Sequence, residues 1–150
     1  MVSFHNTQTC SIDHKGRLSV PVAMRREGPG RKTHDRFFLK YGTEGCLQLY
    51  SVEGWEHMEA KLRKLQRRGP RERGFVRAFG KDAYWVTVDA QGRISISPAL
   101  SGRAGLGKEA LLHGNIEYIE IWNPEKYNAS MAAMPDEKLS ELEQEMLGEE

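Results

Sequence analysis

A five-residue motif occurs twice in this 150-residue chain, and it constrains the fold more than any other feature. Residues 13–17 and residues 89–93 both read Asp-x-x-Gly-Arg. Polar and apolar residues alternate before and after each motif, and a proline follows the second alternating run. Alternation with a period of two predicts half-buried strands. An aspartate that accepts turn N–H groups and a glycine at positive φ predict a tight turn between them. Each copy is therefore expected to be a strand–turn–strand unit.

The two turns are expected to use equivalent residues in equivalent roles. The residues predicted to shape the turns are Asp13, Gly16, Asp89 and Gly92. Arg17 and Arg93 then begin the following strands, and their guanidinium groups are expected to face outward. Such an arginine can contact a phosphate or a base, or it can pair with the aspartate of its own turn and brace the loop. The residues alone leave both interpretations open.

The self-similarity continues beyond the turns, so the chain is expected to contain two copies of one unit. The further matched segments are residues 38–42 with 111–114, residues 46–50 with 118–122, and Trp55 with Tyr127. They predict a hairpin followed by a helix in each copy. Because a small unit buries a low fraction of its surface, the two copies are expected to share one core.

These patterns divide the chain into four segments and predict a mixed fold, mainly β with helices. The segments are a first repeat (7–53), a helical linker (54–82), a second repeat (83–126) and a helical acidic tail (127–150). Gly69 and Pro70 predict a break between two linker helices. Asn123 and Pro124 predict a helix start, as cap and first residue. The polar, Gly- and Pro-rich residues 25–35 predict a loop.

Charge is distributed unevenly along the chain, although the net charge is only +1. Residues 61–81 hold nine lysines and arginines against one acid, and residues 117–150 hold ten acids against two lysines. A basic middle indicates a surface for a polyanion, and an acidic end indicates an interaction segment. A solvated helix face is the alternative for both. Without a signal-peptide pattern or a membrane-length apolar run, a cytoplasmic protein is expected.

One segment resembles a phosphate-binding loop, G-x-x-x-x-G-K-[ST], but departs from it at the last position. Residues 102–108 fit the pattern, whereas Glu109 stands where a hydroxyl must hold magnesium, and a strand follows in place of a helix. The alternative is a flexible loop. The five histidines show no metal-ligand spacing, and Cys10 and Cys46 show no C-x-x-C spacing. We therefore expect no active site, metal or cofactor, and two inert thiols.

Together these features resemble the MraZ family of bacterial transcriptional regulators, in which each repeat is a DNA-binding domain of the SpoVT/AbrB type. The resemblance covers residues 7–130 and rests first on the two Asp-x-x-Gly-Arg units that end in proline. Three other segments support it: Leu-Tyr-x-x-x-x-Trp at residues 49–55, Pro-Arg-Glu-Arg at residues 70–73, and Ala-Gly-Leu-x-Lys-Glu at residues 104–109.

The resemblance implies a double-split β-barrel, in which the swapped hairpins of the two repeats form a pseudo-dimer, and a ring-shaped homo-oligomer. It implies a nucleoid-associated regulator, usually a repressor, that binds repeated promoter boxes of the division and cell-wall gene cluster. The DNA contacts would be Lys15 and Arg17, with Arg93 as the second-copy equivalent and Arg25 as a nearby charge. Two alternatives stay open: a protein-interaction module whose basic helices bind an acidic partner, and a nucleotide-binding enzyme.

Overall fold

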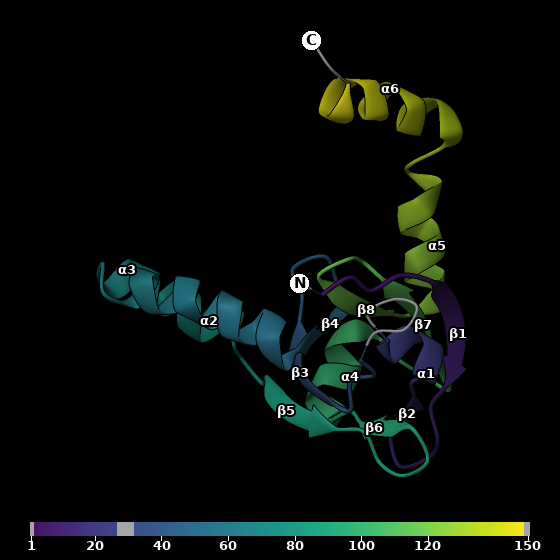
Figure 1. The fold of residues 1–150 in the computed structure, drawn as a ribbon, viewed down its shortest axis with the longest axis horizontal. Helices are drawn as coiled ribbons and strands as arrows, with labels where there is room; N and C mark the ends of the chain where they lie inside the picture. Colours follow the sequence, from purple (N-terminus) through teal and green to yellow (C-terminus); the bar gives the residue numbers. More distant parts are fainter. Residues whose placement is uncertain (1, 27–31, 149–150) are drawn as a thin grey trace.

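Two antiparallel β-sheets form the body of the molecule, and helices extend from it (Figure 1). The computed structural model describes residues 2–26 and 32–148. The strands are β1 (Thr7–Ser11), β2 (Arg17–Ser19), β3 (Arg36–Tyr41), β4 (Leu47–Ser51), β5 (Tyr84–Thr87), β6 (Arg93–Ser95), β7 (Glu109–Gly114) and β8 (Tyr118–Trp122). The helices are α1 (Val22–Arg25), α2 (Val52–Gln66), α3 (Pro70–Phe79), α4 (Pro98–Ala104), α5 (Pro124–Ala132) and α6 (Asp136–Leu147).

The two repeats interleave strand by strand. The large sheet has the order β1-β7-β8-β4-β3-β5, and β2 pairs with β6 in a separate ribbon. Among the described strands, only the hairpins β3–β4 and β7–β8 pair within one repeat; every other ladder joins the first repeat to the second. Exchanging the repeats leaves this order unchanged, which is the arrangement expected of a pseudo-dimer. Closure into a double-split barrel stays a prediction.

One hydrophobic core serves both repeats, as the size of each copy predicted. Leu39 from β3 and Leu112 from β7 are fully buried in it. The ribbon contributes Leu18 and Ile94, which are 0% and 1% exposed and pair with each other across β2 and β6. Since side chains alternate along a strand, the polar neighbours of Leu18 and Ile94 lie on the outer face of the ribbon.

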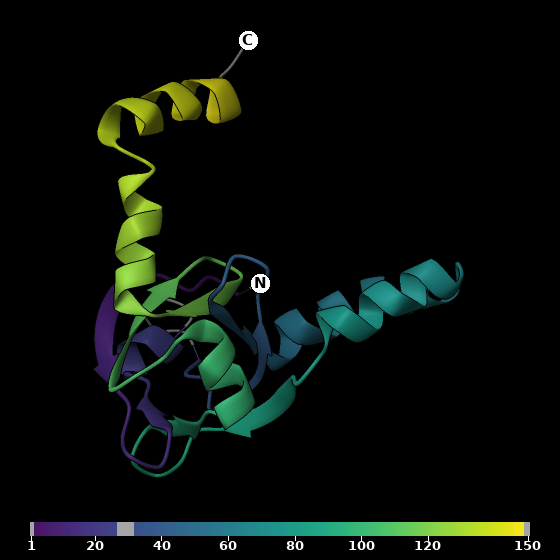
Figure 2. The same ribbon diagram turned by 180° about the vertical axis from the view of Figure 1, so that it is seen from behind.

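A second apolar cluster lies under α2 and α3, on residues that alternate with the core residues of β3 and β4. The Trp55 ring is buried and stacks on Phe38, with ring centroids 4.0 Å apart. After the predicted break at Gly69, α3 packs along α2 and brings Val76 and Phe79 to this cluster. The α2–α3 pair nonetheless projects away from the sheets for much of its length (Figures 1 and 2).

A buried lysine anchors α3 to the sheet. Lys40 is 1% exposed, its Nζ donates to the carbonyl of Tyr41 at 2.7 Å, and the same Nζ lies 3.9 Å from the Phe79 ring centroid. Burial lowers the pKa of Lys40 to about 8. A cation over an aromatic face is attracted to the negative ring surface, so this contact holds the base of the projecting helix pair.

The helix α5 begins as the sequence predicted. The Asn123 side-chain oxygen accepts hydrogen bonds from the N–H groups of Glu125 and Lys126, at 2.8 and 3.1 Å, and Pro124 is the first residue of α5. Past Pro135, α6 has no buried residue and lies at the opposite end of the molecule from β2 and β6 (Figures 1 and 2). Among the described residues, no helix combines the length and apolarity of a membrane span.

The prediction of a loop over residues 25–35 is wrong at its start. Pro21 has φ −57° and leads into the single helical turn of α1, whose last residue is Arg25. The N–H groups of Met24 and Arg25 both donate to the Pro21 carbonyl, at 3.0 and 3.2 Å, so the helical turn extends to Arg25 despite its polar side chain. Arg26 and Thr33 then form an antiparallel bridge, and residues 27–31 lie outside the described part of the chain.

Removing residues 136–150 should leave the rest of the chain folded, because α6 buries no side chain against it. The truncated protein should keep the near-ultraviolet circular dichroism of the parent and melt in one cooperative transition. Comparing melting temperatures at low protein concentration limits contributions from self-association. Loss of the cooperative transition on truncation would contradict this expectation.

Candidate nucleic-acid interface

The first turn is organised by the carboxylate of Asp13. One of its oxygens accepts the backbone N–H groups of Lys15 and Arg17, at 2.9 and 3.0 Å, and the other accepts Nε of Arg17 at 2.7 Å. Gly16 has φ +77°, and its N–H donates to the Asp13 carbonyl at 3.0 Å. A Cβ at Gly16 would stand 3.0 Å from the Ile96 carbonyl oxygen, so both backbone angle and space require glycine here.

The second turn repeats this geometry with its own residues. The Asp89 carboxylate accepts the N–H groups of Gln91 and Arg93, both at 2.9 Å, and Nε of Arg93 at 3.0 Å. Gly92 has φ +79° and donates its N–H to the Asp89 carbonyl at 2.9 Å. The turn-shaping roles predicted for the aspartate and glycine of each motif agree with this geometry.

The fold brings the two turns side by side. The ribbon register places Arg17 opposite Ser95 and Ser19 opposite Arg93. Nη1 of Arg93 also lies 3.6 Å from the Asp13 carboxylate, so the second turn contacts the first. With Leu18 and Ile94 facing the core, the outer face of the ribbon carries two arginines and two serines. We call these four residues, Arg17, Ser19, Arg93 and Ser95, the ribbon face.

The sequence did not single out the serines of the ribbon face or the contact between the turns. Ser19 and Ser95 stand two residues after Arg17 and Arg93, so strand alternation was the available signal for them. The proximity of Arg93 and Asp13 depends on the pairing of β2 with β6, which joins residues far apart in the chain. No local pattern could have shown it.

The two arginines lie on the outer face of the ribbon, as expected, but their guanidinium groups do not extend freely into solvent. Both fold back on the aspartate of their own turn, which leaves the Arg17 side chain 29% exposed and the Arg93 side chain 23% exposed. The bracing interpretation therefore describes the geometry of the free protein. For Arg17, Nε makes the bond to Asp13, and within the described chain no hydrogen-bond acceptor engages its two terminal nitrogens. These two nitrogens therefore keep their donor capacity.

The turns keep their aspartates charged. Hydrogen bonding from the Arg17 backbone N–H is the largest cause that lowers the pKa of Asp13, to about 2 from an ordinary 3.8, and the Arg17 side chain and Lys15 N–H add to it. Partial desolvation opposes these effects. The pKa of Asp89 is lowered by the corresponding bonds, led by the Arg93 N–H. At neutral pH each turn is thus an ion pair whose arginine is fixed by its own carboxylate.

Lys15 and Arg25, the other two predicted contacts, lie in different surroundings. The Lys15 side chain is exposed at the tip of the first turn, where Gln91 occupies the equivalent position of the second. Arg25 is 8% exposed, and it donates from Nε to the Val20 carbonyl and from Nη1 to the His34 carbonyl, both at 3.1 Å. Arg25 therefore supports the backbone beneath the turns, and we do not include it among the proposed DNA contacts.

The backbone of residues 102–108 does not have the geometry of a phosphate-binding loop. These residues span the last turn of α4 and the segment after it, and Gly105 adopts φ +66° and caps the helix. A phosphate loop needs N–H groups at a helix N-terminus, whereas a helix C-terminus presents carbonyl oxygens. Asn123 Nδ2 donates to the Gly105 carbonyl at 2.7 Å and satisfies one of them. The flexible-loop alternative is also wrong for the last turn of α4, which is helical.

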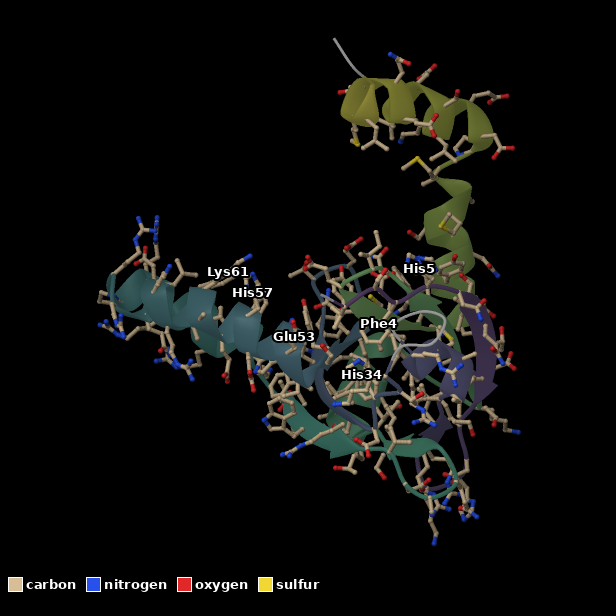
Figure 3. The ribbon with its side chains drawn as sticks, in the orientation of Figure 1. Phe4, His5, His34, Glu53, His57 and Lys61 are labelled. Carbon is tan, nitrogen blue, oxygen red and sulfur yellow. The ribbon has the colours of Figure 1, made fainter. Side chains whose placement is uncertain are left out.

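A cavity of about 430 Å³ lies beside α2, away from the turns. Its lining residues are Val2, Tyr50, Glu53, Gly54, His57, Met58, Lys61 and Glu117. Glu53, His57 and Lys61 follow one another at intervals of four along one side of α2 (Figure 3). Its mixed charges and apolar walls select no particular ligand, and the described residues hold no group of three potential metal ligands. The ribbon face stays the better candidate.

Asp13→Asn should destabilise the fold most at neutral pH. Because the pKa of Asp13 is lower in the folded chain than the ordinary 3.8, its carboxylate stabilises the fold above that pH and loses the effect as pH falls toward about 2. The melting-temperature difference between parent and variant should therefore shrink through that window. Asp136→Asn removes an equal charge outside the turns and is the matched control. A difference that stays constant across the window would contradict this account of the turn.

Comparison with known proteins agrees with the duplicated sheet. The family model described as "MraZ protein, putative antitoxin-like" matches this chain twice, over residues 3–78 and 79–150. A transcriptional regulator MraZ of Christiangramia forsetii is 32% identical over 99% of this chain and 95% of its own. Proteins of the same name from Alkaliphilus metalliredigens and Acetivibrio thermocellus are 39% and 40% identical, over 89% and 84% of this chain and 92% and 85% of theirs. The chain belongs to the MraZ family.

Proposed function

We propose that this protein is a sequence-specific DNA-binding transcription regulator that uses its two arginine turns to bind repeated promoter boxes. The observation that carries the proposal is the ribbon face, on which Arg17 and Arg93 stand close together on paired strands. The relatives are named as transcriptional regulators, which supports the same function. The finer parts of the proposal are repression, the division and cell-wall gene cluster as target, and a cytoplasmic location on the nucleoid.

The ribbon suits the major groove of B-DNA in size and chemistry. That groove admits a two-stranded β-ribbon, and arginine reads guanine there through paired bonds to O6 and N7. The unengaged terminal nitrogens of Arg17 supply such a fork, and Ser19 and Ser95 can bond to several bases. Lys15 is exposed at the tip of the turn, and in this proposal it neutralises a phosphate and releases counterions.

The aspartate in each turn prepares its arginine for binding. A free arginine must lose side-chain entropy when it docks, and this loss reduces affinity. Arg17 is already fixed at Nε by Asp13, and Arg93 at Nε by Asp89. Bracing and DNA contact, which the sequence left as alternatives, therefore become successive parts of one function.

The two turns are not expected to contribute equally. The first turn carries Lys15 where the second carries Gln91, so it holds one more positive charge at its tip. Arg93 also lies near two carboxylates, at 3.0 Å from Asp89 and 3.6 Å from Asp13, which compete with a phosphate or base. We therefore assign most of the affinity to the first turn and a smaller share to the second.

A single ribbon face reads few base pairs, so copies of the chain must act together. We propose a ring-shaped homo-oligomer that presents several ribbon faces to spaced boxes. Once one face is bound, the next binds at a high effective concentration, and overall affinity exceeds that of any single face.

Arg17→Ala should weaken operator binding by roughly 1–3 kcal/mol per ribbon face, about 5- to 150-fold, if its fork pairs with guanine. Arg93→Ala should weaken binding less. Lys15→Ala should weaken binding to operator and scrambled DNA alike and flatten the salt dependence, as loss of a phosphate contact does. Affinities for both DNAs at two salt concentrations, measured by fluorescence anisotropy, separate these outcomes.

Arg17→Lys is the matched control, since it keeps the charge and loses the planar fork. It should retain more affinity for scrambled DNA than Arg17→Ala while losing preference for the operator. Melting curves of every variant show whether bracing of the turn has also been lost. Operator affinity equal to that of the parent for Arg17→Ala, with the turn intact, would end the proposal.

The purified chain should form a closed homo-oligomer larger than a dimer at micromolar concentration. Multi-angle light scattering measures its mass directly. A monomeric mass at every concentration would refute the ring but would leave DNA contact by the ribbon face to be judged by the arginine variants.

A further inference from the structure

Two projecting parts of the molecule carry opposite charge. The first, which we call the basic arm, is residues 61–79 of α2 and α3, with eight lysines and arginines and one acid. The second, α6, has five acids and one lysine. Figure 3 shows nitrogen-tipped side chains along the basic arm and oxygen-tipped ones along α6. Neither charge set belongs to the ribbon face.

Most charges of the basic arm have no carboxylate partner within the described chain. Among the described residues, only Arg63 and Arg71 of the arm have a carboxylate within ion-pair distance, Glu59 at 3.4 Å and Glu72 at 3.1 Å. The Arg71 side chain is 92% exposed. An exposed pair of this kind contributes little to stability and leaves the arginine available to other carboxylates.

Both parts also expose apolar surface. On α6, Leu139, Leu142 and Met146 fall at helical spacing on one face, and Leu139 and Met146 are 53% and 70% exposed. On the basic arm, Phe75 is 52% exposed and lies one helical turn after Arg71. Each part therefore combines an uncovered apolar side chain with charge, in opposite signs.

The two parts do not meet within one chain. α5 carries α6 away from the sheets, and the basic arm leaves the body in another direction, so they are well separated in both views (Figures 1 and 2). Their lengths are nevertheless similar. At 1.5 Å per residue, the 12 residues of α6 span about 18 Å and the 10 residues of α3 about 15 Å.

We propose that α6 of one copy binds the basic arm of a second copy of this chain. The Leu139–Leu142–Met146 stripe covers Phe75 of the neighbour, and acids beside the stripe pair with arginines of its arm. The contact joins different surfaces of the two copies, so the first copy keeps a free arm and the second keeps a free α6. Head-to-tail contacts of this type build rings when the rotation closes. The inference gives the proposed ring its interface and does not depend on DNA binding.

Charge reversal on the full-length chain tests the contact. Glu143→Lys with Glu145→Lys alters acids that flank the apolar stripe on the helix surface, and Arg67→Glu with Arg71→Glu alters the end of the basic arm. Each double variant should shift sedimentation-velocity profiles toward smaller species at matched concentration. The four changes combined in one chain should restore the larger species, because the reversed charges again attract each other across copies.

A matched control lies on the same helix. Glu137→Lys with Glu141→Lys changes the net charge of α6 equally, but on the face opposite the stripe, and should move the assembly less. Circular dichroism verifies that each variant folds. The proposal would be overturned if the Glu143/Glu145 and Arg67/Arg71 double variants both sedimented like the parent. It would also be overturned if the quadruple variant did not recover the larger species. Lower DNA affinity of the arm variant at unchanged assembly would also overturn it, since the arm would then face DNA.

Discussion

The exchange of strands between the repeats is the constraint on which the rest of the structure depends. β1, β2, β5 and β6 find their backbone partners in the opposite repeat, so neither repeat can satisfy its own main-chain hydrogen bonds alone. The core also depends on both repeats, because Leu18 of the first repeat and Ile94 of the second are buried against each other. The side-by-side position of the two turns is a direct result of this exchange.

Each turn joins its structural role and its proposed recognition role in one set of atoms. The aspartate satisfies three donors, two of them backbone N–H groups, and so sets the turn and the arginine together. The arginine stands next to Leu18, which is fully buried in the core. Sites built on regular, packed elements hold their side chains more closely than sites on loops. The ribbon therefore offers a fixed pattern of donors to a partner.

Sequence reasoning predicted what repeats locally and missed what depends on distant neighbours. Alternation and the Asp-x-x-Gly-Arg motif predicted the turns, and the Asn123 cap predicted α5, because each is decided within a few residues. Burial of Arg25 was missed, since its acceptors at Val20 and His34 come together only in the fold. The helical end of α4 was missed because glycines at residues 102 and 105 suggested a loop, although Gly105 serves as the cap.

The pseudo-symmetry of the strand order has a consequence for how the boxes of an operator are oriented. A true dimer presents two identical reading heads, and its target mirrors that symmetry as a palindrome. If the two turns read DNA as proposed, both heads belong to one chain, and Lys15 in the first turn and Gln91 at the equivalent position of the second make them unlike. A chain with two unlike heads binds an asymmetric box, which has a defined orientation along the DNA. Copies arranged around a ring would then favour boxes repeated in the same orientation over inverted ones.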